Sequence, residues 1–398
     1  MSEAAAFRIG INYWPARSAM QWWSRFDAGE VADDFARIAG GGFDSVRLFL
    51  LWEAFQPDPS GVDLAMLERL VAVADHAYRA GLRIMPTLFT GHMSGVNWIP
   101  PWALGGPDRD PRFRVIAGGQ LASEGLRNWY TDPVVRDAQA RLASESAAAI
   151  AGHPALWAWD LGNENSNCVV PPDRAAGLRW LEEMTSAIRS VDPGALVTTG
   201  LHMEDLEQNR HMGPHEVAQT CDFLTMHGYP IYAAWSEGPT DAHLAPFLAE
   251  VTRWLGDGRD VLFSEFGLPT HRRGEGVEGS ADEVGGVLVE EEDAARYTRE
   301  VLEGLLGAGS TGAMLWCYAD YVPDLWMSPP LDEAVHERSF GLWRADGSAK
   351  PAVGAVRGFG PVARVDPPQA AWIDIDPDRY WERPDVELPR LYRRCMER

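Results

Sequence analysis

The stretch ALWAWDLGNEN, residues 155–165, has the pattern of a buried strand that ends in polar side chains. Its first residues, up to Trp159, can bury on both faces, which is typical of a parallel strand that is covered on both sides. The chain then presents Gly162, Asn163 and Glu164 within a few residues. This glutamate has two interpretations: part of a helix cap or surface turn, or a reactive group that the strand holds in place.

Strand-like runs recur along the chain, with helical patterns between them. The expected strands are 7–14, 43–52, 82–90, 155–163, 195–202, 222–229, 260–267 and 312–319. The expected helices are 30–40, 64–81, 133–152, 173–191, 243–256 and 291–309, with a weak candidate at 215–220. Alternation of this kind indicates parallel strands joined by right-handed crossovers. Eight such units predict an α/β fold, a closed (β/α)8 or TIM barrel.

The expected loops differ in length at the two ends of this barrel. Links from helix to strand are short, whereas several links from strand to helix are long, and long loops in a compact domain are usually functional. The long links are roughly 92–132, 203–214, 230–242, 268–290 and 320–349. Because (β/α)8 barrels build their active sites at the C-terminal ends of the strands, this asymmetry places the candidate site there.

Two segments do not follow the strand-and-helix repeat. Residues 272–293 are Gly-rich and acidic and are predicted to form a mobile lid or a solvated excursion. The second segment is 363–398, which is predicted to form a short C-terminal tail packed on the barrel. The rest of the chain, residues 1–362, is predicted to form the catalytic barrel.

The composition excludes several classes of function. The chain has 398 residues and a net charge of −23, which disfavours nucleic acid and anionic membranes as partners. Lys350 is its one lysine, which almost excludes Schiff-base chemistry. No CxxC pair and no apolar run long enough to cross a membrane occurs, and the N-terminus does not resemble a signal peptide. We therefore expect a cytoplasmic protein with free thiols; a homo-oligomer remains open.

Polar and aromatic side chains gather at the C-terminal ends of the expected strands. Taken singly, a histidine there is more often a satisfied hydrogen-bonding group, and a tryptophan is more often part of the core. Their co-location on one barrel face indicates a site. The candidates are Trp14, Arg47, His92, Asn163, Glu164, His202, His227, Tyr229, Glu265 and Trp316, with Trp235 as a further sugar platform.

Glu164 and Glu265 end the fourth and seventh strands, on opposite sides of the barrel mouth. Two carboxyl groups about 5 Å apart are the arrangement of a retaining glycosidase, in which one protonates the leaving oxygen and the other attacks the anomeric carbon. Arg47 and the Tyr229 hydroxyl are expected to hold Glu265 ionised. Glu164 is expected to stay protonated, because an apolar pocket and the nearby Glu265 charge both raise its pKa. Asn163 suits the sugar 2-hydroxyl.

At these residues the sequence resembles glycoside hydrolase family 5, a clan A family of retaining β-glycosidases. The motifs are Asn163-Glu164 in GNEN, Glu265 in SEFG, Arg47 in SVRLFLLWE, His227 and Tyr229 in MHGYP, and Trp316 in GAMLWCYAD. The resemblance covers roughly residues 7–360. It implies a (β/α)8 fold, Glu164 as acid/base and Glu265 as nucleophile, with no cofactor. Its mannanase and β-mannosidase branch implies an oligosaccharide substrate with β-linked mannose.

The mode of cleavage and three alternatives stay open at this stage. HMEDLEQNRH, residues 202–211, could crowd one end of the cleft and make the enzyme exo-acting on short oligosaccharides. Within the family, a β-glucosidase or β-1,4-glucanase is the alternative. Outside it are a carbohydrate-binding barrel without catalysis and a metal-dependent sugar isomerase or epimerase. The oxygen and nitrogen ligands of the last would be Glu164, His202, His227 and Glu265.

Overall fold

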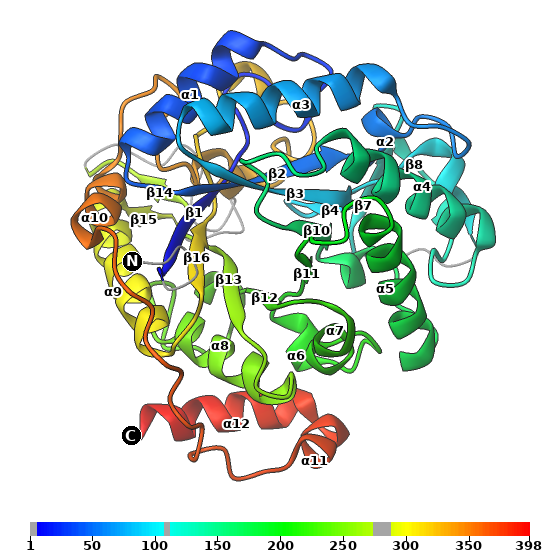
Figure 1. Ribbon diagram of the computed structural model, residues 1–398. Coiled ribbons are helices and arrows are strands. Elements are labelled where there is room, and N and C mark those ends of the chain that lie inside the picture. The colour runs from blue at the N-terminus through cyan, green and yellow to red at the C-terminus, as the bar shows by residue number, and fades with distance from the viewer. Residues whose placement is uncertain (1–5, 107–111, 274–287) are drawn as a thin grey trace.

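The computed structural model describes residues 6–106, 112–273 and 288–398, and its core is an eight-stranded parallel sheet (Figure 1). The strands run in the order β11-β10-β3-β2-β1-β16-β13-β12. A parallel bridge between His202 and His227 joins the two ends, so the sheet closes. The strands are β1 (Arg8–Asn12), β2 (Ser45–Leu51), β3 (Arg83–Thr90), β10 (Trp159–Asn163), β11 (Val197–Gly200), β12 (Leu224–His227), β13 (Val261–Phe266) and β16 (Gly312–Leu315). The predicted TIM barrel is confirmed.

A helix follows each barrel strand and lies outside the sheet (Figure 1). These helices are α1 (Ala28–Gly40), α3 (Leu64–Arg79), α4 (Pro133–Ala149), α5 (Arg174–Arg189), α7 (Pro214–Thr220), α8 (Leu244–Leu255), α9 (Glu291–Gly307) and α10 (Pro351–Phe359). Aspartate caps start several of them: Asp27, Asp63, Asp132 and Asp173 each accept hydrogen bonds from backbone N–H groups in the first turn. The weak candidate at 215–220 is confirmed as α7.

Within the stretch 155–165, strand β10 starts later than the strand predicted at 155–163. Regular pairing of β10 begins at Trp159, whereas the residues before it form turns. Leu156 makes an isolated bridge with Ile84 of β3. The apolar run therefore does not form one continuous strand, and Leu156 and Trp157 within it are only partly buried.

The loop after β3 builds two small sheets at the C-terminal face of the barrel. One contains β4 (His92–Met93), β5 (Val96–Trp98), β7 (Arg114–Ala117) and β8 (Gln120–Ala122). The other pairs β6 (Leu104–Gly106) with β9 (Gly125–Leu126). Short elements also occur in other loops: α2 (Trp52–Phe55), α6 (Glu204–Glu207), β14 (Thr270–His271) and β15 (Val289–Glu290). Most of the acidic segment 272–293 lies outside the described residues, and so does the predicted lid.

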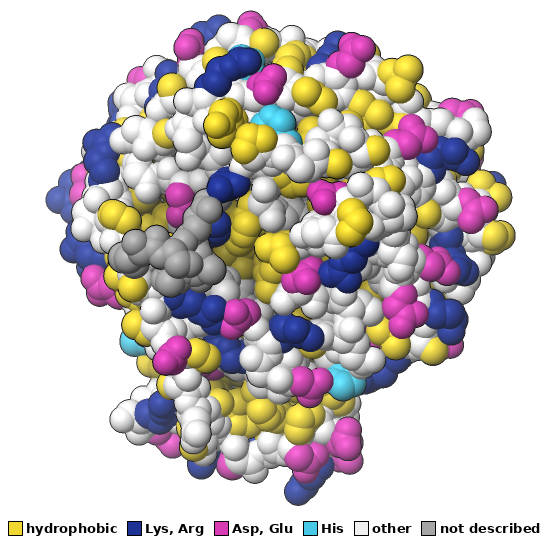
Figure 2. All heavy atoms as spheres, in the orientation of Figure 1, with side chains coloured by type: hydrophobic (Ala, Val, Ile, Leu, Met, Phe, Trp, Pro, Cys, Tyr) yellow, Lys and Arg dark blue, Asp and Glu magenta, His cyan; other side chains and the backbone are white. Residues whose placement is uncertain are grey.

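The C-terminal residues form two helices, α11 (Pro377–Glu382) and α12 (Pro384–Met396), beside the barrel (Figure 1). The Trp372 indole donates a hydrogen bond of 2.7 Å to Glu250 of α8, and the Tyr380 hydroxyl donates one of 2.7 Å to the Leu206 carbonyl. On the face in Figure 2, acidic and basic side chains are interspersed. None of the helices in the described ranges combines the length and apolar character needed to cross a bilayer.

The side chain of Arg47 on β2 lies inside the barrel with no exposed surface. Its guanidinium donates hydrogen bonds of 2.9 and 2.6 Å to Asp160 of β10 and one of 2.5 Å to Glu265 of β13. Asn163 Oδ1 and Asn12 Oδ1 accept from it at 2.8 and 3.2 Å. Because a buried charge is costly unless it is paired and hydrogen-bonded, these acceptors stabilise the arrangement of β2 and the three strands that carry them, β1, β10 and β13.

Removal of one partner from this buried network is expected to destabilise the fold. Asp160→Ala removes one of the two carboxylates that balance the buried Arg47 charge, so we expect the free energy of unfolding to fall by about 3–5 kcal/mol. Glu145→Ala breaks the surface pair with Arg141, at 4.0 Å, and should cost less than about 1 kcal/mol. Urea denaturation measures both values. Equal losses for the two variants would contradict a structural role for the buried pair.

Candidate active site

A cavity of about 440 Å³ opens at the C-terminal ends of the barrel strands. Its walls come from the loops after β3, β11, β12 and β16 and from the tips of β10 and β13. Among the residues predicted from the sequence, those lining it are His92, Asn163, Glu164, His202, His227, Tyr229, Glu265 and Trp316. Most of the predicted strand-tip residues are therefore brought together in one pocket.

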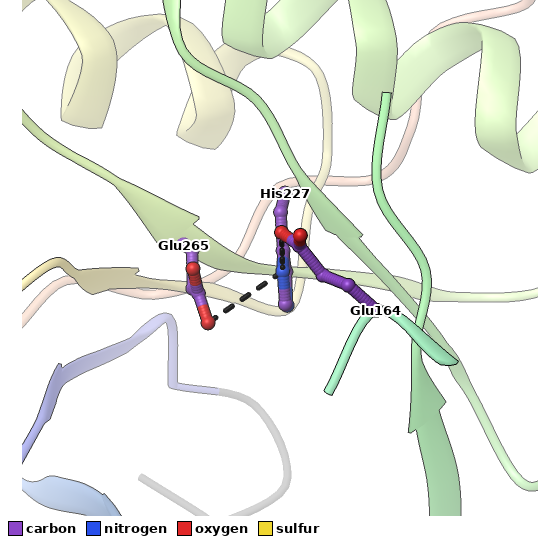
Figure 3. A group of neighbouring side chains, drawn as sticks. All are labelled: Glu164, His227 and Glu265. Carbon is purple, nitrogen blue, oxygen red and sulfur yellow. Dashed lines mark hydrogen bonds and ion pairs between the residues drawn. The ribbon is translucent and has the colours of Figure 1, made fainter. Parts of the chain in front are cut away.

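The two predicted carboxylates lie on either side of His227 (Figure 3). His227 Nδ1 is 2.9 Å from Glu164 Oε1 and 3.5 Å from Glu265 Oε1. One carboxylate oxygen of each glutamate and this nitrogen lie within 4.8 Å of one another. The separation is small enough for both carboxyl groups to reach the same sugar ring.

Glu164 has an unusual backbone conformation. Its φ of 49° and ψ of 47° lie in the left-handed region, which costs a residue with a side chain roughly 1–2 kcal/mol. The conformation follows the end of β10 and starts the short 3-10 helix Asn165–Asn167. Strain of this size persists where the surrounding structure fixes it, often at functional sites.

Glu265 is held by the two contacts that the sequence predicts for it. Arg47 Nη1 donates to Oε1 at 2.5 Å, and the Tyr229 hydroxyl donates to Oε2 at 2.8 Å. Arg47 itself lies beneath the pocket and does not line it, so the prediction that it binds substrate is corrected to a supporting role. The ion pair and the hydroxyl donor together fix the orientation of this carboxyl group.

The environment of Glu164 differs from the prediction. His227 Nδ1 and Asn167 Nδ2 donate to its two oxygens at 2.9 and 3.0 Å, and nitrogens of His92 and His202 lie 3.9 Å away. Burial raises the pKa of Glu164, but electrostatic interaction with His202, the hydrogen bond and electrostatic interaction with His227, and electrostatic interaction with His92 together outweigh burial and lower this pKa below its ordinary value. The expected raised pKa and protonated state are therefore wrong for the free pocket. The prediction considered Glu265 as a neighbour but not the histidines.

Asn163 lies beside Glu164 and is fixed by both ends of its amide. Oδ1 accepts from Arg47 at 2.8 Å, and Nδ2 donates to the His92 carbonyl at 2.8 Å. The amide orientation is therefore set before substrate arrives.

Two predicted aromatic platforms lie outside the pocket lining. Trp14 is fully buried and stacks on Phe49, with ring centroids 4.9 Å apart. Trp235 donates to Glu207 at 2.8 Å and packs on Tyr392 of α12 at 5.3 Å. The position of Trp14 beside a strand end and of Trp235 in a long loop did not reveal that one ring turns into the core and the other packs against the C-terminal tail.

Several residues that line the pocket were not predicted. They come from loops that lack a strand or helix pattern from which a side-chain direction could be read: Ser94, Arg112, Phe113, Asn167, Tyr232, His336 and Glu337. Glu204 and Glu207, in the segment expected to crowd one end, also line it. Arg112 Nη1 donates to Glu204 at 2.6 Å, and this contact joins the loops after β3 and β11.

Comparisons with known proteins agree with this geometry. Mannan endo-1,4-beta-mannosidase 4 of Oryza sativa subsp. japonica is 26% identical over 270 residues, which cover 60% of this chain and 56% of that protein. Mannan endo-1,4-beta-mannosidase 2 of the same plant is 26% identical over 302 residues, which cover 67% and 62%. The chain thus spans less than two thirds of the length of these curated relatives.

Solved structures share the barrel over most of this chain. A GH5_18 protein from Streptomyces cattleya, in complex with Manb1-4GlcNAc, is 25% identical with a TM-score of 0.72, covering 89% of this chain and 81% of its own. The exo-beta-1,4-mannosidase Op5Man5 from Opitutaceae bacterium strain TAV5 is 26% identical with a TM-score of 0.70, covering 90% and 61%. The model of the family described as cellulase (glycosyl hydrolase family 5) matches residues 7–291, which is more than half of the chain. The chain belongs to glycosyl hydrolase family 5.

Proposed function

We propose that this protein is a retaining β-mannosidase that removes single mannose residues from the ends of short β-linked oligosaccharides. The observation that carries the proposal is the approach of Glu164 and Glu265, whose carboxylate oxygens lie within 4.8 Å across one pocket. A short separation suits double displacement, because it leaves no room for a water molecule between the second carboxylate and the sugar.

The proposed reaction assigns one role to each carboxylate. Glu265, held beside Arg47, attacks the anomeric carbon and forms a glycosyl ester. Glu164 protonates the leaving oxygen and then takes a proton from the water that hydrolyses this ester. His227 Nδ1 donates a hydrogen bond of 2.9 Å to Glu164 Oε1, which helps to orient this carboxyl group. Asn163, already oriented, is placed to bind the 2-hydroxyl.

The choice of β-mannosides rests on the relatives. Both rice proteins are named as mannan endo-1,4-beta-mannosidases, and the Streptomyces cattleya structure holds a disaccharide with mannose at one end. Op5Man5 is named as an exo-beta-1,4-mannosidase. Mannose and glucose differ only at C2, so a β-glucosidase stays the alternative within the family.

The proposed exo action rests on contacts between two loops. Ser94 in the loop after β3 donates to Glu337 in the loop after β16 at 2.9 Å, and Arg114 donates to Asp332 at 2.8 and 2.7 Å. In the sheet, β2 and β1 lie between β3 and β16. The contacts therefore cross the barrel mouth above these strands and obstruct a polymer that would extend in that direction.

A metal-dependent isomerase is supported by one observation, because Glu164, His227 and Glu265 could hold a cation. The Arg47 guanidinium, 2.5 Å from Glu265, places a fixed positive charge on the same carboxylate. This charge opposes a divalent cation, so we favour hydrolysis.

Hydrolysis and anomeric retention are tested on nitrophenyl β-mannoside, β-glucoside and β-galactoside. We expect the mannoside to be cleaved fastest, in the presence of a chelator, with the β-anomer as first product by NMR. Glu265→Ala should lose at least ~10³-fold in rate, because the covalent route is closed. Glu382→Ala, an exposed glutamate on α11, is the control. An inverted product, or chelator-sensitive activity, would refute the mechanism.

The histidine charges predict a pH effect. His202→Gln removes one charge that lowers the pKa of Glu164, so this pKa rises and the protonated acid persists to higher pH. The alkaline limb of the kcat/KM profile should move to higher pH than in the wild type. His243→Gln, exposed and outside the pocket, should leave the limb in place. If the alkaline limb of the kcat/KM profile is unchanged or moves to lower pH in His202→Gln, the assignment of Glu164 as the acid is contradicted.

The mode of cleavage is tested on mannotetraose and on long mannan. We expect mannose as the first released sugar from the tetrasaccharide, because the joined loops close one end of the pocket. The viscosity of the polymer should stay nearly constant during early turnover. Early release of mannobiose, with a rapid fall in viscosity, would show internal cutting and reject exo action.

A further inference from the structure

Glu337 differs from the other buried glutamates in the described part of the chain. The buried glutamates there are Glu216, Glu265, Glu291 and Glu337. The first three each pair with an arginine: Glu216 with Arg174 at 3.0 Å, Glu265 with Arg47 at 2.5 Å and Glu291 with Arg344 at 2.9 Å. The ion pair recorded for Glu337 is with His336, at 3.7 Å.

His336 supplies little lasting charge to this pair. Burial lowers the pKa of the His336 imidazole, which favours its neutral form near pH 7. Burial, together with the negative charges of Glu265 and Glu164, raises the pKa of Glu337 to about 7. An ionised Glu337 is therefore costly for the folded protein, whereas a neutral glutamine could accept the same hydrogen bonds without that cost.

The position of Glu337 is fixed from two sides. It lies in the 3-10 helix Val335–Ser339 of the loop after β16 and lines the pocket. Its Oε2 accepts from the Ser94 hydroxyl at 2.9 Å and from the Trp316 indole at 3.3 Å. The carboxylate also interacts with the Tyr232 hydroxyl, and His336 Nε2 lies 3.7 Å from Oε1. Because a carboxylate has about four acceptor sites, Glu337 can still accept from a ligand hydroxyl.

The location of Glu337 also indicates which end of a sugar it would meet. Ser94 and Glu337 form part of the contact that crosses the mouth above β1 and β2. Glu164, the proposed proton donor to the leaving group, lies at the tip of β10, beyond β3 in the sheet. A sugar between them would turn its leaving group toward Glu164 and its far hydroxyls toward Glu337.

We propose that Glu337 is a substrate-binding residue whose carboxylate accepts hydrogen bonds from ring hydroxyls of the terminal sugar, on the side away from the scissile bond. The inference rests on the proposed function, since it assumes that the pocket takes the terminal sugar of a β-glycoside. A carboxylate suits this task because it accepts from two neighbouring hydroxyls, and such charge-assisted bonds are stronger than neutral ones.

Binding without turnover separates this inference from the proposed activity. Methyl β-mannoside and its 3-, 4- and 6-deoxy analogues are titrated by calorimetry into the wild type, Glu337→Gln and Asp324→Asn. Asp324 is an exposed carboxylate on the same loop and serves as the matched control. The corresponding methyl β-glucoside and β-galactoside series are titrated into the wild type as well. If the wild type binds one of these more tightly than the mannoside, the choice of mannose is wrong, and the variants are then compared on the series that binds best.

We expect the wild type and Asp324→Asn to bind at least one deoxy analogue about ten- to a hundredfold more weakly than its parent. In Glu337→Gln the same preference should shrink to a few-fold, because the charged acceptor is gone. Unchanged preference in Glu337→Gln, or equal weakening for the parent and every analogue, would overturn the inference.

A second variant guards against misfolding of the first. Ser94→Ala removes one of the two donors that position Glu337 Oε2 and leaves the carboxylate itself unchanged, so the carboxylate should be less well fixed. We expect it to retain the wild-type circular dichroism spectrum and to lose part of the same deoxy-analogue preference. A Ser94→Ala protein with full preference would count against Glu337 as the group that reads those hydroxyls.

Discussion

The buried guanidinium of Arg47 is the interaction on which the barrel interior and the site both depend. It bonds to Asp160, Glu265, Asn163 and Asn12, which lie on three other strands. The charge cannot be left unpaired inside the protein, so these strands must present their acceptors at matching heights. The same contacts orient the Glu265 carboxyl group and the Asn163 amide before any ligand binds, which is what electrostatic preorganisation requires. Stability and chemistry therefore share one network.

The sequence was sufficient for the barrel because its signals are local and repeated. Apolar runs, helical periodicity and short helix-to-strand links each mark one βα unit, and eight of them leave few topologies. Glu164 and Glu265 could be found because each ends a strongly hydrophobic strand. In a parallel barrel, that position alone implies a place at the rim of the C-terminal face. The direct contacts of Glu265 with Arg47 and Tyr229 followed from the same reasoning.

The rest of the site depends on contacts that no local pattern encodes. His92, His202 and His227 were each candidates, but their convergence on Glu164, which reverses the expected direction of its pKa shift, requires the closed sheet. Trp14 and Trp235 do not line the pocket because the Trp14 ring turns into the core and the Trp235 ring packs against the C-terminal tail. Neither direction can be read from a local sequence pattern. Glu337 lies in an irregular loop, and its meeting with Ser94 joins residues 243 positions apart.

The left-handed backbone of Glu164 has an evolutionary consequence. Asparagine and glycine tolerate this conformation better than glutamate does, so the fold alone would favour replacing the acid. Selection for catalytic turnover must therefore retain glutamate at this position although other residues would suit the backbone conformation better. A laboratory screen that rewards heat resistance without assaying catalysis would be expected to enrich dead enzymes altered at this one position, robust but unable to process sugar.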